Sequence, residues 1–261
     1  MKIKNCFVAV LFVALMGSAL AQQYRTDVVI DGFVGRIAKV DQKMYEAKVS
    51  GGEMQRGTLL EHLQTVYSSK GHRKNMTFLS TGEDNVIFRT RYKHDGFGLV
   101  TLEQIVDPAE NVVGRTYYVY NQNNILSETY VEDAERQVEN RVRYYYDNTG
   151  RLSQRSYNDP LNEIYKREVY TYDNNGDIAR TVVFDRNKKK MQEWRYEYDE
   201  HHQPVSQTLY DYTEDEPEVF LTLFRYQYDD NGNWIQKVEY TLDNDRTTPV
   251  FITERYMEYF K

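Results

Sequence analysis

Aromatic side chains alternate with polar or basic ones along several short stretches of the chain. The clearest stretches are YYYDNTGRL at 144–152, YTYDNNGDI at 170–178 and YQYDDNGNW at 226–234. Alternation of this kind predicts β-strands, because successive side chains of a strand point to opposite faces of the sheet. The pattern therefore predicts a sheet with one tyrosine-rich face and an opposite face that carries rows of arginine.

The stretches recur along the chain at a nearly constant interval, which indicates an internal repeat. Four aspartates mark the clear copies at spacings of 26, 26 and 30 residues: Asp147, Asp173, Asp199 and Asp229. Steps of 26 residues toward the N-terminus reach three weaker copies, at Asn121, Asp95 and Ser69. Tyrosine lies one and three residues before most of these positions, and 11 of the 24 tyrosines occupy these two places.

The D-x-x-G segments predict tight hairpin turns. The side chain of Asp147 can accept backbone hydrogen bonds, and Gly150 can adopt the left-handed conformation that the third turn residue requires. In such a hairpin the residue before the aspartate faces the residue five positions after it. The predicted cross-strand pairs are Tyr120 with Leu126, Tyr146 with Leu152, Tyr172 with Ile178, and Tyr228 with Trp234.

Each repeat thus contains two strands and two turns. Residues 59–260 hold about 15 predicted strands and no convincing helix, residues 26–31 look strand-like, and residues 59–66 fit a strand or a short helix. The predicted fold is all-β: a continuous antiparallel β-meander of about 15 strands, built from 26-residue hairpin repeats. A sheet of this length must curl into a barrel or an open half-shell, and curling around the tyrosines leaves arginine outside.

Residues 1–21 have the three parts of a signal peptide. Lys2 and Lys4 form a basic start, residues 6–16 are apolar, and Ala19-Leu20-Ala21 fits a cleavage site. We therefore predict an exported protein that is periplasmic, outer-membrane associated or extracellular. The predicted organisation is a cleaved leader at 1–21, an N-terminal segment with the first strands at 22–58, and a β-hairpin repeat domain at 59–261.

Composition narrows the function further. The single cysteine, Cys6, lies in the leader, so the mature chain has no thiol for a disulfide, a metal site or a nucleophile. A formal net charge of −7 argues against nucleic-acid binding. We also expect no membrane integration, because a lipid-facing strand surface is apolar and neither face of this sheet is. Aliphatic residues are scarce, which predicts that tyrosine supplies much of the buried area.

The segments YYYDNTGRL, YTYDNNGDI and YQYDDNGNW resemble YD/RHS repeats, whose pattern is Y-D-x-x-G-[RN]-[LIW]. The resemblance is clear over residues 90–241. In leader, length and hairpin motifs, the whole chain also resembles short secreted Bacteroidetes proteins of unknown function that have a porin-like β-barrel fold. This resemblance implies an antiparallel barrel in the cell envelope, and it implies no activity.

No motif of a nucleophile and its base or of a metal site is present, so we predict no catalytic residue, no cofactor and no metal. The D-x-x-G loops lack the ligand spacing of a calcium loop. His201 and His202 have no third ligand nearby, and one would have to come from His62, His72 or His94. Four carboxylates remain open as a glycosidase pair: Glu163, Glu168, Glu193 and Glu197.

Four aromatic residues are the predicted ligand-binding residues: Trp194, Tyr196, Tyr228 and Trp234. Rings of this kind stack on sugars and offer a polar group, although we expect the same face to be chiefly the core. The predicted function is a non-enzymatic binding or structural protein of unknown ligand, with a glycan or an envelope protein as candidate partner. The alternatives are a carbohydrate-binding or glycoside-hydrolysing protein and, third, a small outer-membrane β-barrel.

Overall fold

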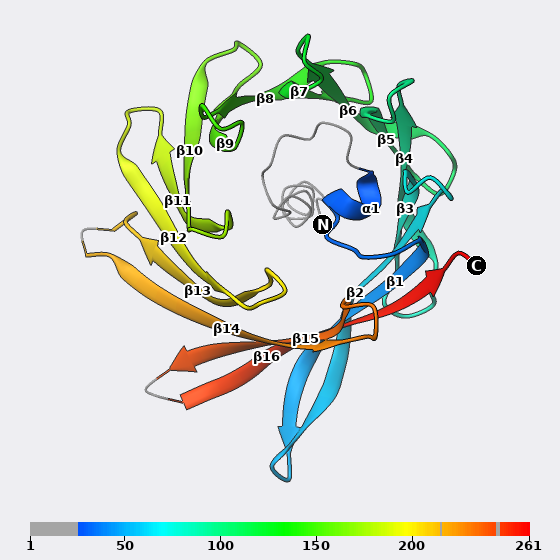
Figure 1. The fold of residues 1–261 in the computed structure, drawn as a ribbon, viewed down its shortest axis with the longest axis vertical. Helices are drawn as coiled ribbons and strands as arrows, with labels where there is room; N and C mark the ends of the chain where they lie inside the picture. Colours follow the sequence, from blue (N-terminus) through cyan, green and yellow to red (C-terminus); the bar gives the residue numbers. More distant parts are fainter. Residues whose placement is uncertain (1–25, 215, 244–245) are drawn as a thin grey trace.

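The chain folds into a closed antiparallel β-barrel of 16 strands in a computed structural model, which describes residues 26–214, 216–243 and 246–261 (Figure 1). Each strand pairs with its neighbour in sequence, and β1 pairs with β16 to close the ring. The predicted meander is therefore confirmed, and the sheet forms a barrel rather than an open half-shell. The leader predicted at residues 1–21 lies outside the described residues.

The first half of the wall consists of β1 (Ile37–Ser50), β2 (Glu53–Tyr67), β3 (Arg73–Leu79), β4 (Val86–His94), β5 (Val100–Val106), β6 (Val112–Tyr120), β7 (Leu126–Asp133) and β8 (Val138–Tyr146). The second half consists of β9 (Leu152–Asn158), β10 (Ile164–Tyr172), β11 (Ile178–Asp185), β12 (Lys190–Tyr198), β13 (Pro204–Asp211), β14 (Glu218–Tyr228), β15 (Trp234–Asp243) and β16 (Arg246–Tyr259).

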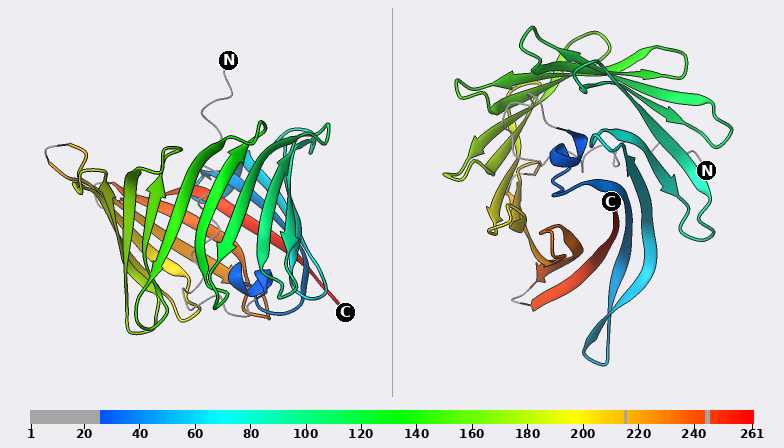
Figure 2. Two further views of the ribbon diagram at one scale, coloured as in Figure 1. Left: turned by 90° about the horizontal axis from the view of Figure 1, so that it is seen from above. Right: turned by 45° about the vertical axis from the view of Figure 1, so that its right-hand side comes forward.

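The strand predicted at residues 26–31 is wrong, because this segment forms the short helix α1 (Asp27–Ile30). The β-branched residues of the segment favour a strand, but tertiary contacts decide its conformation. The backbone N–H of Val28 donates to the carbonyl of Gly71, and the Asp27 carboxylate accepts the backbone N–H of Arg73. Figures 1 and 2 show α1 inside the ring, toward one end of the wall.

A small apolar core surrounds this N-terminal segment. The buried residues are Val28, Phe33, Ile37, Val40 and Tyr67, with Met257 and Tyr259 packed against them. They join α1 and the segment after it to β1, β2 and β16. Because β1 also closes the barrel against β16, the N-terminal segment is part of the closure.

The predicted hairpin register is confirmed at all four sites. Tyr120 pairs with Leu126, Tyr146 with Leu152, Tyr172 with Ile178, and Tyr228 with Trp234. In the turn that begins at Asp147, the backbone N–H groups of Thr149 and Arg151 donate to Oδ1 of the aspartate, and Gly150 has a φ of 81°. The aspartate side chain thus accepts hydrogen bonds from backbone N–H groups of the turn, as the sequence predicts.

The turns at the opposite end of the barrel use the same geometry with a different third residue. Asp107, Asp133, Asp159 and Asp185 each accept the backbone N–H three residues later, from Glu110, Arg136, Asn162 and Lys188. These four third residues have positive φ values despite their side chains. The Asp side chain bonds to the backbone in these turns too, so the geometry is kept although the sequences vary.

One predicted turn position shifts by one residue. In the hairpin between β2 and β3, Ser68 rather than Ser69 makes the backbone contacts that aspartate makes in the other turns. The N–H of Ser68 donates to the carbonyl of His72. The interval from this turn to the next is therefore 27 residues. The residue directly before the turn remains aromatic, as Tyr67 pairs with Arg73 across it.

The tyrosine rows face the barrel interior. Asp31, which follows α1 inside the ring, binds both Tyr67 and Arg73, and the Arg73 guanidinium lies over the ring of Tyr92. Contacts then continue around the inner wall from Tyr92 to its partner Glu103, which accepts a bond from the Tyr118 hydroxyl. Alternation places the arginine rows on the outer face, as predicted.

Several arginines of the outer face form ion pairs. Glu110 binds Arg89 and Arg91, and Glu128 binds Arg141 and Arg143. Glu193 contacts three cations at once, Arg180, Lys190 and Arg195, and its side chain is only 1% exposed. The outer faces of β4, β8 and β12 are therefore charged.

Candidate functional site

The tyrosines that precede the turn aspartates fasten neighbouring hairpins to one another. The hydroxyl of Tyr120 donates to the carbonyl of Val100, and that of Tyr146 donates to the carbonyl of Leu126. Tyr172 and Tyr198 repeat this bond with Leu152 and Ile178. This row is consequently structural: each of its hydroxyls is already engaged by the preceding hairpin.

The tyrosines three residues before the turn aspartates form a second row, and two of them, Tyr118 and Tyr170, belong to a polar network inside the barrel. The hydroxyl of Tyr118 donates to Glu103 and that of Tyr170 donates to Glu168, which also accepts a bond from Tyr157 on β9. Burial raises the pKa of Glu103, and Tyr118 and Arg73 oppose that rise only in part. Burial also acts on Glu168, but Arg155 and Lys166 outweigh it and lower the pKa of that carboxyl.

The four predicted ligand-binding residues lie on the inner face of β12 to β15, and each is half-buried. Two of them have covered rings. The Arg255 guanidinium lies 3.3 Å from the ring centre of Trp234, and His201 lies 4.2 Å from the ring centre of Tyr228. Burial lowers the pKa of Arg255 to about 9. The ligand-binding role of the four residues stays a prediction.

Trp194 and Tyr196 are the less occupied pair. They lie two residues apart on β12, where Trp194 faces Thr181 on one side and Leu209 on the other. In the described part of the chain no ring or cation stacks on Trp194, and the ring of Tyr196 contacts only Tyr198, at 6.4 Å. A half-buried indole beside a half-buried phenol is the kind of surface on which a sugar ring stacks.

The four carboxylates considered as a glycosidase pair do not converge. Glu168 lies on the inner face, whereas Glu193 and Glu197 lie on the outer face of β12. Glu163 belongs to an exposed turn, and Glu197 accepts a bond from Ser206. The barrel wall separates Glu168 from the other candidates, which argues against shared catalysis by these residues.

The vicinal histidines point to different partners. His201 stacks on Tyr228, whereas Nδ1 of His202 lies 2.7 Å from Oδ2 of Asp177. The hydrogen bond to Asp177 raises the pKa of His202. His202 is exposed and forms only this two-residue pair, so the two neighbours do not form a common site.

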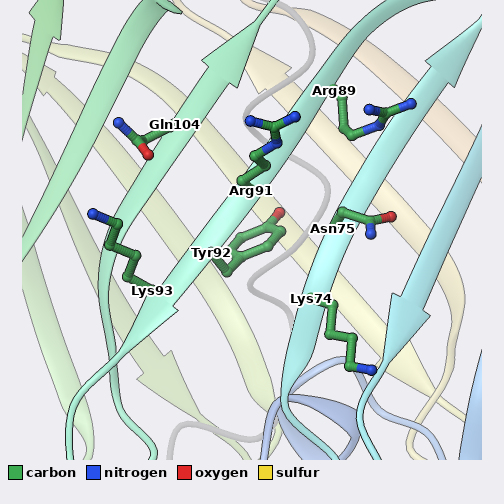
Figure 3. A pocket seen from close by; sticks show the side chains of 7 residues that line it. All are labelled: Lys74, Asn75, Arg89, Arg91, Tyr92, Lys93 and Gln104. Carbon is green, nitrogen blue, oxygen red and sulfur yellow. The ribbon is translucent and has the colours of Figure 1, made fainter. Parts of the chain in front are cut away.

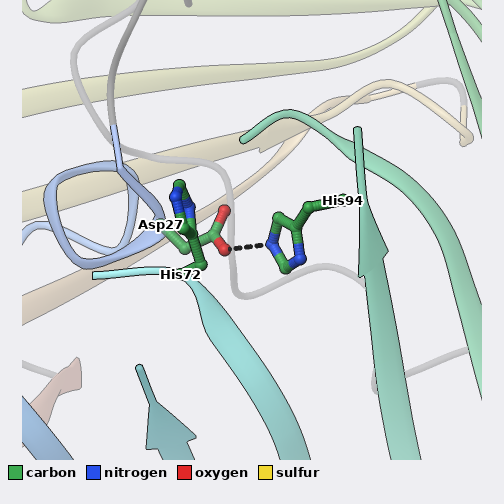
Figure 4. Close-up of side chains that lie close together, drawn as sticks. All are labelled: Asp27, His72 and His94. Carbon is green, nitrogen blue, oxygen red and sulfur yellow. Dashed lines mark hydrogen bonds and ion pairs between the residues drawn. The ribbon is translucent and has the colours of Figure 1, made fainter. Parts of the chain in front are cut away.

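The structure brings together three residues that sequence reasoning did not combine: Asp27, His72 and His94 (Figure 4). One carboxylate oxygen and two imidazole nitrogens lie within 4.8 Å of one another. Asp27 belongs to α1, His72 precedes β3, and His94 ends β4. The available signal was that His94 occupies the repeat position that is tyrosine in Tyr120 and the later copies.

A cationic hollow of about 470 Å³ lies on the outer wall over β3, β4 and β5 (Figure 3). Its lining residues are Lys74, Asn75, Arg89, Arg91, Tyr92, Lys93 and Gln104. Arg89 and Arg91 are already paired with Glu110. The hollow therefore has less free positive charge than its composition indicates.

The comparisons with known proteins show the fold alone. The chain is similar to a porin-like protein from Bacteroides uniformis, with a TM-score of 0.56 and 10% identity over 86% of this chain and 99% of that one. A porin-like protein from Bacteroides vulgatus gives a TM-score of 0.45 at 12% identity, with the same coverage. A chain of a TcdB2-TccC3-Cdc42 complex gives a TM-score of 0.30 at 14% identity, and the match covers 80% of this chain and 14% of that one.

No model of a known protein family matches the chain, and no curated protein sequence matches it. The YD/RHS resemblance therefore rests on the hairpin motifs themselves. The fold of the porin-like protein from Bacteroides uniformis agrees with the predicted antiparallel barrel. Among the helices of the described residues, none has the length and apolar character needed to cross a membrane.

Proposed function

We propose that this chain is an exported cell-envelope protein that binds a saccharide inside its barrel and catalyses no reaction. The observation that carries the proposal is the half-buried aromatic pair of Trp194 and Tyr196 on the inner wall, next to a polar rather than apolar interior. Barrels of about 16 strands are wide enough to enclose water in addition to their side chains. A polar ligand with stacking faces suits this surface.

The outer wall supports a barrel that faces water rather than lipid. A lipid-facing barrel needs an apolar band about 25 Å tall, and charged side chains at its middle cost about 2–4 kcal/mol each. Here the ion pairs around Glu110, Glu128 and Glu193 occupy the outer faces of β4, β8 and β12. Their distribution favours a water-facing binding barrel over the small outer-membrane barrel.

The interior carboxyls do not favour hydrolysis. Glu168 is bound by two tyrosine hydroxyls and by Lys166, so no substrate group has free access to its oxygens. Glu103 accepts a bond from Tyr118 in the same way. Both carboxyls therefore serve the inner wall, and binding remains the function that the geometry supports.

A glycan array followed by calorimetry tests the proposal. We expect the wild-type chain to bind at least one class of saccharide and Trp194→Ala to weaken that binding by tenfold or more. Tyr145→Ala is the matched control, because Tyr145 is an exposed ring on the outer face of β8. Absence of any saccharide ligand, or equal affinity of Trp194→Ala and wild type, contradicts the proposal.

A further inference from the structure

We propose that Asp27, His72 and His94 bind a divalent transition-metal ion of the zinc type, and that this ion fastens α1 to the inner wall of the barrel. The inference is independent of the saccharide proposal, because the three residues lie on α1, before β3 and at the end of β4 rather than on β12.

The geometry of the three donors is the first support. Nε2 of His94 lies 2.7 Å from Oδ2 of Asp27, and the two imidazole rings are 5.0 Å apart at an angle of 45°. One donor atom from each residue lies within 4.8 Å of the other two. Ligands about 2.0–2.2 Å from a zinc ion are separated by somewhat more than 3 Å, so small side-chain movements suffice to surround an ion.

An unpaired imidazole nitrogen is the second, independent support. Nδ1 of His72 is buried and has no hydrogen-bond partner among the described residues. A buried polar atom without a partner is uncommon in native proteins and calls for a water or an ion. A metal ion bound through this ring gives the histidine the polar partner that the protein itself does not supply.

The local backbone leaves room for the His72 ring. Gly98 has a φ of 86°, and a Cβ atom at this position would lie only 2.3 Å from Cε1 of His72. Glycine therefore satisfies two demands at once, the left-handed turn and the space for an imidazole. The equivalent Gly232 has no atom within 4 Å of the same point. The His72 ring therefore lies close to Gly98, and no side chain of the described residues lies at the same place beside Gly232.

The residue types fit a transition metal better than calcium or magnesium. Two imidazoles and one carboxylate are the donors of many zinc sites, in which three protein ligands leave a fourth position for water or a ligand. The backbone N–H of Arg73 donates to Asp27 and holds its carboxylate in place. The Arg73 guanidinium is engaged by Asp31, so that its charge is balanced beside the site.

Metal titration of the purified full chain tests the inference. After treatment with EDTA, we expect one equivalent of Zn²⁺ to bind, and Co²⁺ to give visible absorption bands that Zn²⁺ abolishes. Asp27→Asn is nearly isosteric, and His94→Tyr restores the residue found at this repeat position. We expect each variant to lose at least tenfold in Zn²⁺ affinity, together with the Co²⁺ bands.

His202→Asn is the matched control, because it removes a histidine that pairs with one carboxylate and keeps a residue type tolerant of the left-handed backbone. We expect His202→Asn to bind Zn²⁺ like wild type, and circular dichroism reports whether each variant keeps its sheet. Three outcomes overturn the inference: no binding of Zn²⁺ or Co²⁺ by wild type, unchanged binding by folded Asp27→Asn, or loss of binding in His202→Asn.

Discussion

The hydroxyl of Tyr146 lies 2.8 Å from the carbonyl oxygen of Leu126, and this bond joins one hairpin to the one before it. The bond spans 20 residues of sequence and recurs between Tyr120 and Val100 and between Tyr198 and Ile178. The tyrosine before each turn therefore couples consecutive repeats through the inner wall.

Removal of this hydroxyl should lower stability. We expect Tyr146→Phe to reduce the free energy of unfolding by about 0.5–1.5 kcal/mol, because the phenyl ring keeps its packing but leaves the Leu126 carbonyl without this donor. Urea unfolding measures the change. Tyr145→Phe, on the exposed outer face, should leave the midpoint unchanged. Equal effects of the two variants would show that the inner hydroxyl has no special role.

Alkaline pH should unfold the barrel abruptly. Burial raises the pKa of Tyr172 and of Tyr196 to about 12, and it raises the pKa of most other inner tyrosines as well. The unfolded chain loses these protons near pH 10, whereas the folded chain keeps them. The stabilisation is therefore complete below pH 10 and is lost as the pH rises toward 12.

Each such tyrosine can lower the free energy of unfolding by up to about 1.4 kcal/mol for each pH unit above 10. We expect phenolate absorbance at 295 nm and loss of the β-sheet signal in circular dichroism to rise together in one cooperative step. Non-cooperative titration of most tyrosines near pH 10, with the sheet intact, would place the rows in contact with water.

Alanine at Gly98 should be more damaging than alanine at Gly232. Both glycines have a positive φ, which costs an alanine about 1 kcal/mol or more. At Gly98 the new methyl group also collides with His72, so we expect a further loss of about 1–3 kcal/mol in the free energy of unfolding. Urea unfolding of the two variants measures the difference. Equal losses would mean that the His72 ring does not occupy the space beside Gly98.

The ion cluster of Glu193 with Arg180, Lys190 and Arg195 should make the stability of the protein depend on pH in the acid range. Hydrogen bonds from Arg180, opposed by burial and reinforced by Lys190 and Arg195, lower the pKa of Glu193 to about 2. A lowered folded-state pKa adds stability that is complete above about pH 4.5 and is lost as the pH falls toward 2.

We therefore expect Glu193→Gln to be less stable than wild type at pH 7 by about 1–3 kcal/mol. The difference between the two proteins should shrink between pH 4.5 and 2, as followed by thermal unfolding at each pH. Glu197→Gln is the control on the same face of β12, where the carboxylate is exposed and binds Ser206. A difference that does not change with pH would contradict this account of the cluster.

The fold was largely predictable because the repeat carries its own register. The turn at Asp147 and Gly150 fixes which residues face one another, and the pair of Tyr146 and Leu152 follows from it. Closure between β1 and β16 was not predictable in the same way, since it joins the two ends of the sheet through contacts far apart in sequence. The strand predicted at residues 26–31 was wrong for a similar reason, because Gly71 and Arg73 hold α1 in place.

The candidate sites were predictable only where one strand contains them. Trp194 and Tyr196 share a strand face, so alternation alone places them together. Asp27 and His94 are separated by 67 residues and meet because α1 folds into the ring that β4 helps to form. A break in the repeat, histidine where other copies have tyrosine, was the local sign that the position of His94 has another role.

If the barrel holds its two tyrosine rows inside and turns a charged wall to water, residues 22–261 should not enter a lipid bilayer, and vesicle flotation measures this. The chain, purified without detergent, is mixed with phospholipid vesicles and centrifuged through a density gradient. We expect a monodisperse protein that stays at the bottom of the gradient while the vesicles rise. A chain that rises with the vesicles, or that stays in solution only with detergent, would contradict it.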